Sequence, residues 1–149
     1  GIGLYGYGTF DGYGEALKPA LELKSTISCI RIVGKGETAG YRQTYKAKEA
    51  IKAAVIPLGY FDGYPRALSN KAEVLIGGKR AKVIGLVCMN AMLADVTGIK
   101  CAVGDEVTLI GRQGNEMVTA MELAHKIDTI PHEILCRLPE HLPRKHCFK

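Results

Sequence analysis

The sequence lacks the features that mark membrane-spanning and nucleic-acid-binding proteins. It has no tryptophan, and no apolar run approaches the ~18 residues that a membrane-spanning helix needs. It has no long block of like charges, and aromatic side chains do not alternate with its basic ones. The net charge of +5 therefore indicates a solvated basic surface rather than a nucleic-acid interface. The 149 residues, 47% of them hydrophobic, predict one folded domain.

Paired cysteines are lacking too, because the five cysteines are scattered at positions 29, 88, 101, 136 and 147 and none forms a C-x-x-C pair. This odd, dispersed set argues against a disulfide framework or a zinc ribbon. In the C-terminal tail, His141 and His146 lie near the last two cysteines, but the spacing matches no common zinc pattern and prolines interrupt it. We therefore predict no metal site and a reducing, cytoplasmic environment.

The chain starts at Gly1, without an initiator methionine or the basic segment of a signal peptide, so we expect further residues to precede it in the parent protein. Residues 1–6 match the dinucleotide-binding pattern G-x-G-x-x-G. That pattern requires a helix directly after the glycines, whereas residues 7–14 continue with more glycines. No dinucleotide site is predicted, although the backbone N–H groups of such a loop suit a phosphate.

Most of the chain has the pattern of short strands separated by turns. Apolar, β-branched runs predict strands at residues 24–33, 51–58, 73–76, 79–84, 86–96, 106–110 and 133–138. Gly77-Gly78 separates two of these runs and predicts a two-residue hairpin turn, because both central positions need a positive φ. A further turn is predicted at residues 111–114, with Met117-Val118 beginning the returning strand.

One helix is predicted, at about residues 119–128. Thr119 and Glu122 form the T-x-x-E capping box, and apolar residues follow at positions 120, 123, 124 and 127, on one face of a helix. Many short strands with a single helix predict a mainly β protein, a small closed or nearly closed β-barrel, rather than a doubly wound α/β sheet.

Three segments carry side chains that are suited to chemistry, and each has an ordinary structural interpretation. Tyr41 lies in a polar loop, where a tyrosine is usually a surface residue; a role in proton transfer requires a nearby cation. Residues 60–66 form a turn in which Asp62 caps its own loop. Cys88 and Met89 lie in a predicted strand, where both types are ordinarily core residues.

Taken in order, these segments resemble the C-terminal domain of alanine racemase, a pyridoxal-phosphate enzyme. The matching stretches are residues 1–6, residues 17–25, Gly40-Tyr-Arg-Gln-Thr-Tyr45, Ile56-Pro-Leu-Gly-Tyr-Phe-Asp-Gly-Tyr-Pro-Arg66 with the following residues to 69, Val87-Cys-Met-Asn90, residues 103–114 and residues 134–138. The match runs nearly from end to end, and an ordered series of this length is far more specific than any single motif.

The resemblance implies a two-domain homodimeric enzyme that interconverts L- and D-alanine for peptidoglycan. Its N-terminal barrel carries the lysine that holds pyridoxal 5′-phosphate, and that barrel is absent here. Residues 1–14 then correspond to the end of the barrel's last strand and its loop, and residues 15–149 to the C-terminal β domain. Without its barrel, the chain is expected to be inactive.

The resemblance also implies roles for five positions. Two bases act on opposite faces of the substrate Cα: the barrel lysine, and a tyrosine from the partner subunit that matches Tyr41. The backbone of Met89 matches a contact to the substrate carboxylate, and Tyr60 matches a tyrosine at the inner neck of the substrate channel. Backbone N–H groups at Gly1 and Ile2 match contacts to the cofactor phosphate.

The sequence departs from the family at positions near the expected site. Pro131-His132 replaces the usual Asn-Tyr, whose tyrosine contacts the phosphate, so His132 is the candidate donor there. Leu86 replaces an arginine and Asn90 an aspartate, which leaves serine or another small amino acid open as the substrate. Two alternatives remain: a stand-alone, non-catalytic dimerisation or binding module, and a related decarboxylase. The second is less favoured because residues 40–41 and 87–89 follow the racemase pattern.

Overall fold

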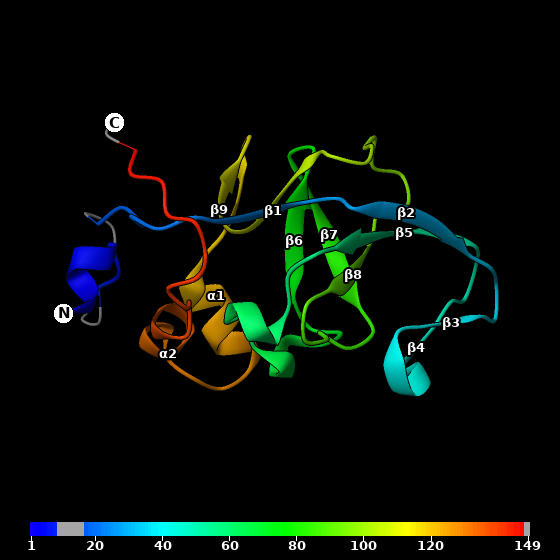
Figure 1. Ribbon diagram of the computed structural model, residues 1–149, viewed down its shortest axis with the longest axis horizontal. Helices are drawn as coiled ribbons and strands as arrows, with labels where there is room; N and C mark the ends of the chain where they lie inside the picture. The colour runs from blue at the N-terminus through cyan, green and yellow to red at the C-terminus, as the bar shows by residue number, and fades with distance from the viewer. Residues whose placement is uncertain (9–16, 148–149) are drawn as a thin grey trace.

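The computed structural model describes residues 1–8 and 17–147 (Figure 1). In chain order its elements are η1 (Ile2–Tyr5), β1 (Leu23–Thr26), β2 (Cys29–Val33), β3 (Thr38–Ala39), η2 (Tyr41–Gln43), β4 (Tyr45–Lys46), β5 (Ile51–Ile56), η3 (Tyr60–Asp62), η4 (Arg66–Leu68), β6 (Glu73–Ile76), β7 (Lys79–Ile84), β8 (Met92–Asp95), β9 (Glu106–Gln113), β10 (Glu116–Val118), α1 (Ala120–Lys126) and α2 (Pro131–Cys136), where η marks a 3-10 helix. The expected boundary at residues 14 and 15 lies outside the described residues.

One antiparallel sheet contains most of the strands, as expected for a mainly β protein. Its strand order is β1-β9-β6-β7-β8-β5-β2, with β10 added on β9, while β3 and β4 pair separately. Within the described residues no ladder joins β1 to β2, so the expected closed barrel is not formed. The two ends of the sheet are instead linked by the chain itself, because only residues 27–28 separate β1 from β2. The backbone N–H of Ile27 donates to Asp105 on the β9 side, and that of Ser28 donates to Val55 in β5.

The predicted hairpin at Gly77-Gly78 is confirmed. These two residues join β6 to β7 and have φ values of 58° and 72°, in the left-handed region that glycine adopts without strain. The turn predicted at residues 111–114 was placed too early. β9 runs on to Gln113, and Gly111 pairs with Val118 of β10 inside the ladder, so the chain reverses at residues 114–115.

The helix predicted at residues 119–128 is confirmed as α1. The Thr119 hydroxyl accepts a hydrogen bond from the backbone N–H of Glu122 at 3.0 Å, which caps the first turn. The capping box is only half formed, because the Glu122 carboxylate binds Arg80 instead of returning to Thr119. Among the described helices, none is long and apolar enough to cross a bilayer.

The strand predicted at residues 133–138 is wrong, and the described part of the chain contains two α-helices instead of the one expected. Residues 131–136 form α2. Pro131 occupies the first helical turn, where its missing N–H has no helical acceptor to lose and its fixed φ favours the helix. Ile134 and Leu135 are both buried, as neighbours on the inner side of a short helix. Six residues are too few to distinguish a helical period from a buried strand.

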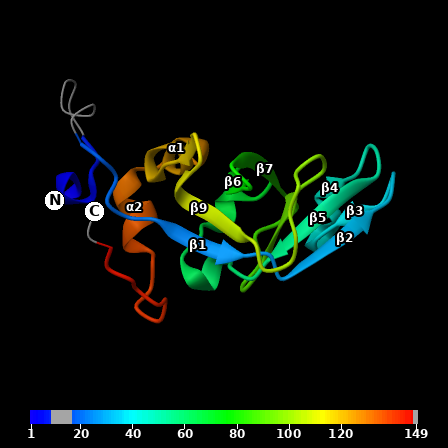
Figure 2. The same ribbon diagram turned by 90° about the horizontal axis from the view of Figure 1, so that it is seen from above.

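The hydrophobic core lies between the sheet and the two α-helices, which sit side by side at one end of the molecule (Figures 1 and 2). Leu75, Leu109 and Leu123 bring β6, β9 and α1 together there, each fully buried. Tyr64 is also fully buried; its hydroxyl has no hydrogen-bond partner among the described residues, and burial raises its pKa. A smaller cluster around Ile51 and Ile84 lies beside the β3–β4 pair.

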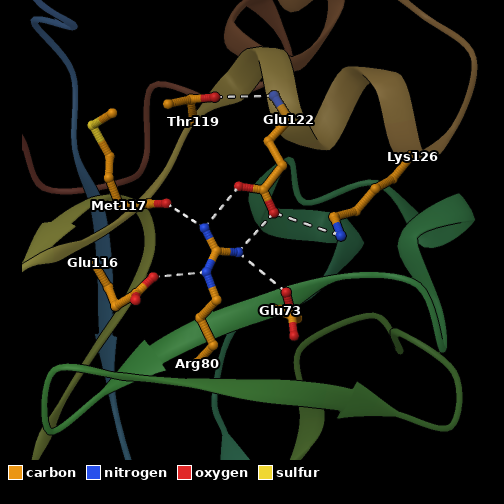
Figure 3. Close-up of polar contacts among 7 residues, drawn as sticks. All are labelled: Glu73, Arg80, Glu116, Met117, Thr119, Glu122 and Lys126. Atoms are coloured by element: carbon orange, nitrogen blue, oxygen red, sulfur yellow. Dashed lines mark hydrogen bonds and ion pairs between the residues drawn. The ribbon is translucent and has the colours of Figure 1, made fainter.

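Arg80 of β7 forms the centre of a half-buried charged cluster (Figure 3). Its guanidinium donates to Glu116 at 2.8 Å, to Glu73 at 3.1 Å and to Glu122 at 2.9 and 3.2 Å. It also donates to the Met117 carbonyl at 2.6 Å. Hydrogen bonds to Glu122 and Glu116 raise the pKa of Arg80, which stays charged. One side chain thus connects β6, β7, β10 and α1.

Candidate functional site

An open pocket of about 870 Å³ lies where three segments meet. The first segment is η2 with its flanking residue, the second comprises the short helices η3 and η4, and the third is the loop between β7 and β8 with the start of β8. The residues that line it are Gly40, Tyr41, Arg42, Tyr60, Arg66, Leu86, Val87, Cys88, Met89, Asn90, Ala91, Met92 and Leu93. Its volume falls within the range of small-molecule sites. Tyr41, Tyr60 and Met89, which are far apart in the sequence, are therefore brought into one pocket.

Tyr41 is presented by a tight turn between β3 and β4. Gly40 has a φ of 76°, and the two residues after the tyrosine, Arg42 and Gln43, also have positive φ values of 60° and 53°. Three left-handed residues around one position hold the chain in an outward turn, and 73% of the Tyr41 side chain is exposed. Its hydroxyl is therefore available to a ligand or to a second polypeptide.

Tyr60 is held against the loop that carries Met89. The backbone N–H of Tyr60 donates to the Cys88 carbonyl at 2.9 Å, and that of Phe61 donates to the Met89 carbonyl at 3.0 Å. The strand predicted at residues 86–96 is therefore only partly formed: β8 covers Met92–Asp95, and residues 86–90 form a loop. Met89 is 53% exposed, so its interpretation as a core residue was wrong. Its carbonyl and that of Cys88 bind η3 instead of a neighbouring strand.

This close contact between η3 and the loop requires a glycine at position 59. A Cβ on Gly59 would lie 2.1 Å from the Cys88 carbonyl oxygen and 2.4 Å from that of Met89, although its φ of −147° suits any residue. We expect Gly59→Ala to lower the free energy of unfolding by about 1–3 kcal/mol, because rigid backbone has to move. Chemical denaturation of both proteins measures the difference. Gly3→Ala, where nothing lies within 4 Å, is the control and should change stability little. Equal stability of wild type and Gly59→Ala would contradict the steric argument.

Asp62 stabilises the same turn, as the sequence predicted. Its carboxylate accepts from the backbone N–H of Gly59 at 2.9 Å. Its second oxygen lies 3.3 Å from Nε2 of His141, whose ring also stacks on Phe61 with a centroid distance of 4.9 Å. The C-terminal tail therefore returns to η3, beside Tyr60. No cluster of metal-ligating side chains occurs among residues 1–8 and 17–147, and the five cysteines are free thiols.

The residues expected at the cofactor phosphate lie elsewhere. Gly1 is the N-cap of η1, which begins at Ile2 and is a 3-10 helix rather than the end of a strand. His132 is exposed in the first turn of α2. In both views η1, in blue beside the N label, and α2 lie together at the end of the molecule opposite β3 and β4 (Figures 1 and 2).

The backbone at this end leaves room for the phosphate end of pyridoxal phosphate. A Cβ added at Gly1 or Gly3 would meet nothing within 4 Å, so the backbone there has room for a ligand. The N–H groups that open a helix have no helical acceptor and suit an anion. The same residues include no lysine, so they cannot hold the cofactor's carbonyl group. Any contact of these residues with the cofactor would therefore be to its phosphate.

Sequence reasoning did not assign Arg42 or Arg66 to the site, yet both line the pocket, together with Asn90, which the sequence had placed near it. Arg66 follows Pro65 in the turn at residues 60–66. The sequence therefore indicated that Arg66 lies in a turn, but not that it lines the pocket. For Arg42 the sequence was misleading, because adjacent side chains on an extended chain point apart. The left-handed backbone at positions 42 and 43 replaces that extended geometry and brings Arg42 into the same pocket as Tyr41.

The sheet, the short helices and the pocket define a mainly β domain with a solvent-open site of small-molecule size. A sequence model described as "Alanine racemase, C-terminal domain" matches residues 20–146. Alanine racemase of Methylacidiphilum infernorum is 43% identical over 147 residues, which cover 98% of this chain and 38% of that protein. The chain belongs to the alanine racemase C-terminal domain family, within the pyridoxal-phosphate enzymes.

Solved structures agree with this assignment. The crystal structure of alanine racemase from E. faecalis matches with a TM-score of 0.90 and 34% identity, over 97% of this chain and 39% of that one. Alanine racemase from Bartonella henselae, solved with covalently bound pyridoxal phosphate, matches with a TM-score of 0.83 and 32% identity, over 94% and 38%. The chain therefore spans less than half the length of these relatives.

Proposed function

We propose that this chain is the C-terminal domain of a pyridoxal-phosphate-dependent alanine racemase, and that Tyr41 is one of its two bases. The observation that carries the proposal is the pocket itself. Tyr41, Tyr60 and Met89, the three positions that the family resemblance assigns to the substrate, line one cavity although 48 residues of sequence separate the first from the last. The exposed Tyr41 side chain is accessible to a substrate in the pocket, which proton transfer requires.

Each residue has a distinct task in this proposal. The deprotonated phenolic oxygen of Tyr41 accepts the proton from one face of the substrate Cα, or its protonated form returns one there, and the lysine of the barrel acts on the other face. The backbone of Met89 binds the substrate carboxylate, and Tyr60 narrows the channel. Bound pyridoxal phosphate withdraws electrons from Cα and so acidifies its proton. Two bases are required because one fixed group cannot reach both faces.

The separation between Tyr41 and the residues expected at the cofactor phosphate supports action across a dimer. The phosphate candidates lie at the η1–α2 end and Tyr41 lies at the η2 end, with the sheet between them (Figures 1 and 2). A tyrosine at one end of this domain cannot reach a cofactor held at the other end of the same chain. We therefore infer a homodimer in which Tyr41 enters the partner's active site.

The five free thiols suit the expected cytoplasmic setting.

A second candidate function is racemisation of serine or another small amino acid. Leu86 and Asn90, two positions where the sequence departs from the family, both line the pocket beside Tyr41. Leu86 lacks the positive charge of the family's usual arginine, and Asn90 lacks the negative charge of its usual aspartate. These two changes alter which substrate side chain the channel accepts. Comparing kcat/KM for alanine and serine in the full-length enzyme discriminates the two functions, and a stand-alone binding module would turn over neither.

The proposal predicts that the 149-residue chain alone is inactive. We expect no racemisation of L-alanine above the uncatalysed rate, and no saturable binding of pyridoxal phosphate at micromolar concentrations, because the lysine and the barrel are missing. Polarimetry and cofactor absorbance measure these two quantities. The full-length alanine racemase of Methylacidiphilum infernorum, assayed in parallel, is the positive control. Turnover by the isolated chain would contradict the two-base scheme.

A further inference from the structure

The pocket beside Tyr41 carries positive charge that nothing in the described chain neutralises. Arg42 and Arg66 both line it, and no aspartate or glutamate does. Neither arginine has a carboxylate within salt-bridge distance among residues 1–8 and 17–147, whereas Arg80 and Arg137 are both paired. The other polar side chains of the lining, those of Tyr41, Tyr60 and Asn90, can all donate hydrogen bonds. The lining therefore suits an anion.

The backbone at Arg42 indicates that its side chain is not there for the turn. Its φ of 60° and ψ of 9° are left-handed, a conformation that glycine and asparagine adopt more easily than arginine. Strained residues of this kind cluster at functional sites. Gln43 has the same left-handed backbone but does not line the pocket, so of these two residues only Arg42 is placed to act there through its guanidinium.

We propose that Arg42, with Arg66 adding a second positive charge, binds the α-carboxylate of an amino acid as it enters the pocket. This inference rests on the proposed function and assigns it a capture residue. A guanidinium binds a carboxylate through two parallel N–H···O bonds, and it remains charged at all physiological pH values. Leu86 and Leu93 add apolar surface to the same lining. The same carboxylate then passes to the backbone of Met89.

A capture role predicts a particular kinetic signature. Arg42 contributes to substrate binding but does not exchange the proton at Cα, so its loss should raise KM and leave kcat nearly unchanged. The attraction is electrostatic and the pocket is open, so it weakens as salt concentration rises. The wild-type kcat/KM should therefore fall with ionic strength more steeply than that of a variant without the charge.

The test uses the full-length dimeric enzyme that contains this chain. Arg42→Asn keeps a residue that tolerates the left-handed turn and removes the charge, and Arg42→Lys keeps the charge but loses the planar fork. We expect KM for alanine to rise about fivefold to tenfold in Arg42→Asn and less in Arg42→Lys, with kcat within about twofold. Arg31→Gln, an exposed arginine on β2 outside the pocket, should match wild type. An unchanged KM, or an unchanged salt dependence, in Arg42→Asn overturns the proposal.

A binding experiment on the chain itself separates this inference from the proposed function. Titration with sodium propionate, monitored by NMR at the Arg42 and Met89 amides, should give saturable shifts in wild type and none in Arg42→Asn. Propionamide, the neutral isostere, should give none with either protein. Propionate binding without alanine racemisation by the full-length enzyme refutes the racemase and leaves the carboxylate site standing. Absence of propionate binding to a folded wild-type chain overturns the carboxylate site.

Discussion

Replacing Tyr41 with phenylalanine in the full-length enzyme should lower L-to-D turnover by about 10²–10⁴-fold, the usual contribution of a positioned acid or base. The change removes one hydroxyl from a side chain that is mostly exposed, so no core packing is lost. Cofactor absorbance should be retained, because Tyr41 is proposed to exchange a proton with the substrate and not to hold the cofactor. Polarimetry in both directions, starting from L-alanine and from D-alanine, measures the effect.

A tyrosine four residues further on provides the matched control. Tyr45 lies in β4, outside the lining of the Tyr41 pocket, and burial raises the pKa of its hydroxyl. Tyr45→Phe should therefore keep most of the activity. Unchanged L-to-D turnover in Tyr41→Phe would remove Tyr41 from its proposed role. Mixing Tyr41→Phe subunits with subunits lacking the barrel lysine, and recovering partial activity, would support transfer across the dimer.

Arg80→Ala should have the largest effect on stability, a loss of about 3 kcal/mol in the free energy of unfolding. The substitution leaves three carboxylates close together with no cation at their centre (Figure 3). Arg80→Lys should lose less, because it keeps the charge but not the planar fork of donors. Arg31→Ala, an exposed arginine without a carboxylate partner among the described residues, should change stability little. Urea denaturation measures all three variants. A loss equal to that of Arg31→Ala would show that the cluster contributes nothing.

The same cluster predicts how stability depends on pH. Burial alone would raise the pKa of Glu122, but hydrogen bonds and charge from Arg80, together with Lys126, outweigh it and lower the pKa below its usual 4.5. A carboxyl with a lowered folded-state pKa stabilises the fold above its unfolded-state pKa. That stabilisation is lost as pH falls through the folded-state value. Wild type should thus lose more stability than Glu122→Gln as the pH is lowered from about 5 to about 3. Equal losses of unfolding free energy in wild type and Glu122→Gln over this pH range would refute this interpretation.

Elements whose signals are local were predicted correctly from sequence. The Gly77-Gly78 hairpin depends on the φ of two residues, and α1 depends on a cap and an apolar period within one segment. Elements decided by distant partners were not. Residues 133–138 and 86–90 were predicted as strands because both segments are apolar. In the structure, α2 packs on the core and the Cys88 and Met89 carbonyls accept from η3, contacts that the sequence does not reveal.

The sequence by itself determined the mainly β class, the family resemblance and the residue types of the site, because these depend on order and chemistry along the chain. Only the tertiary structure decided which of those residues meet. It placed Tyr41, Tyr60 and Met89 in one pocket, left Gly1, Ile2 and His132 at the opposite end, and added Arg42 through a left-handed turn. The physical reason is that a pocket is made by contacts between η2, η3 and the loop before β8, and such contacts have no local signature.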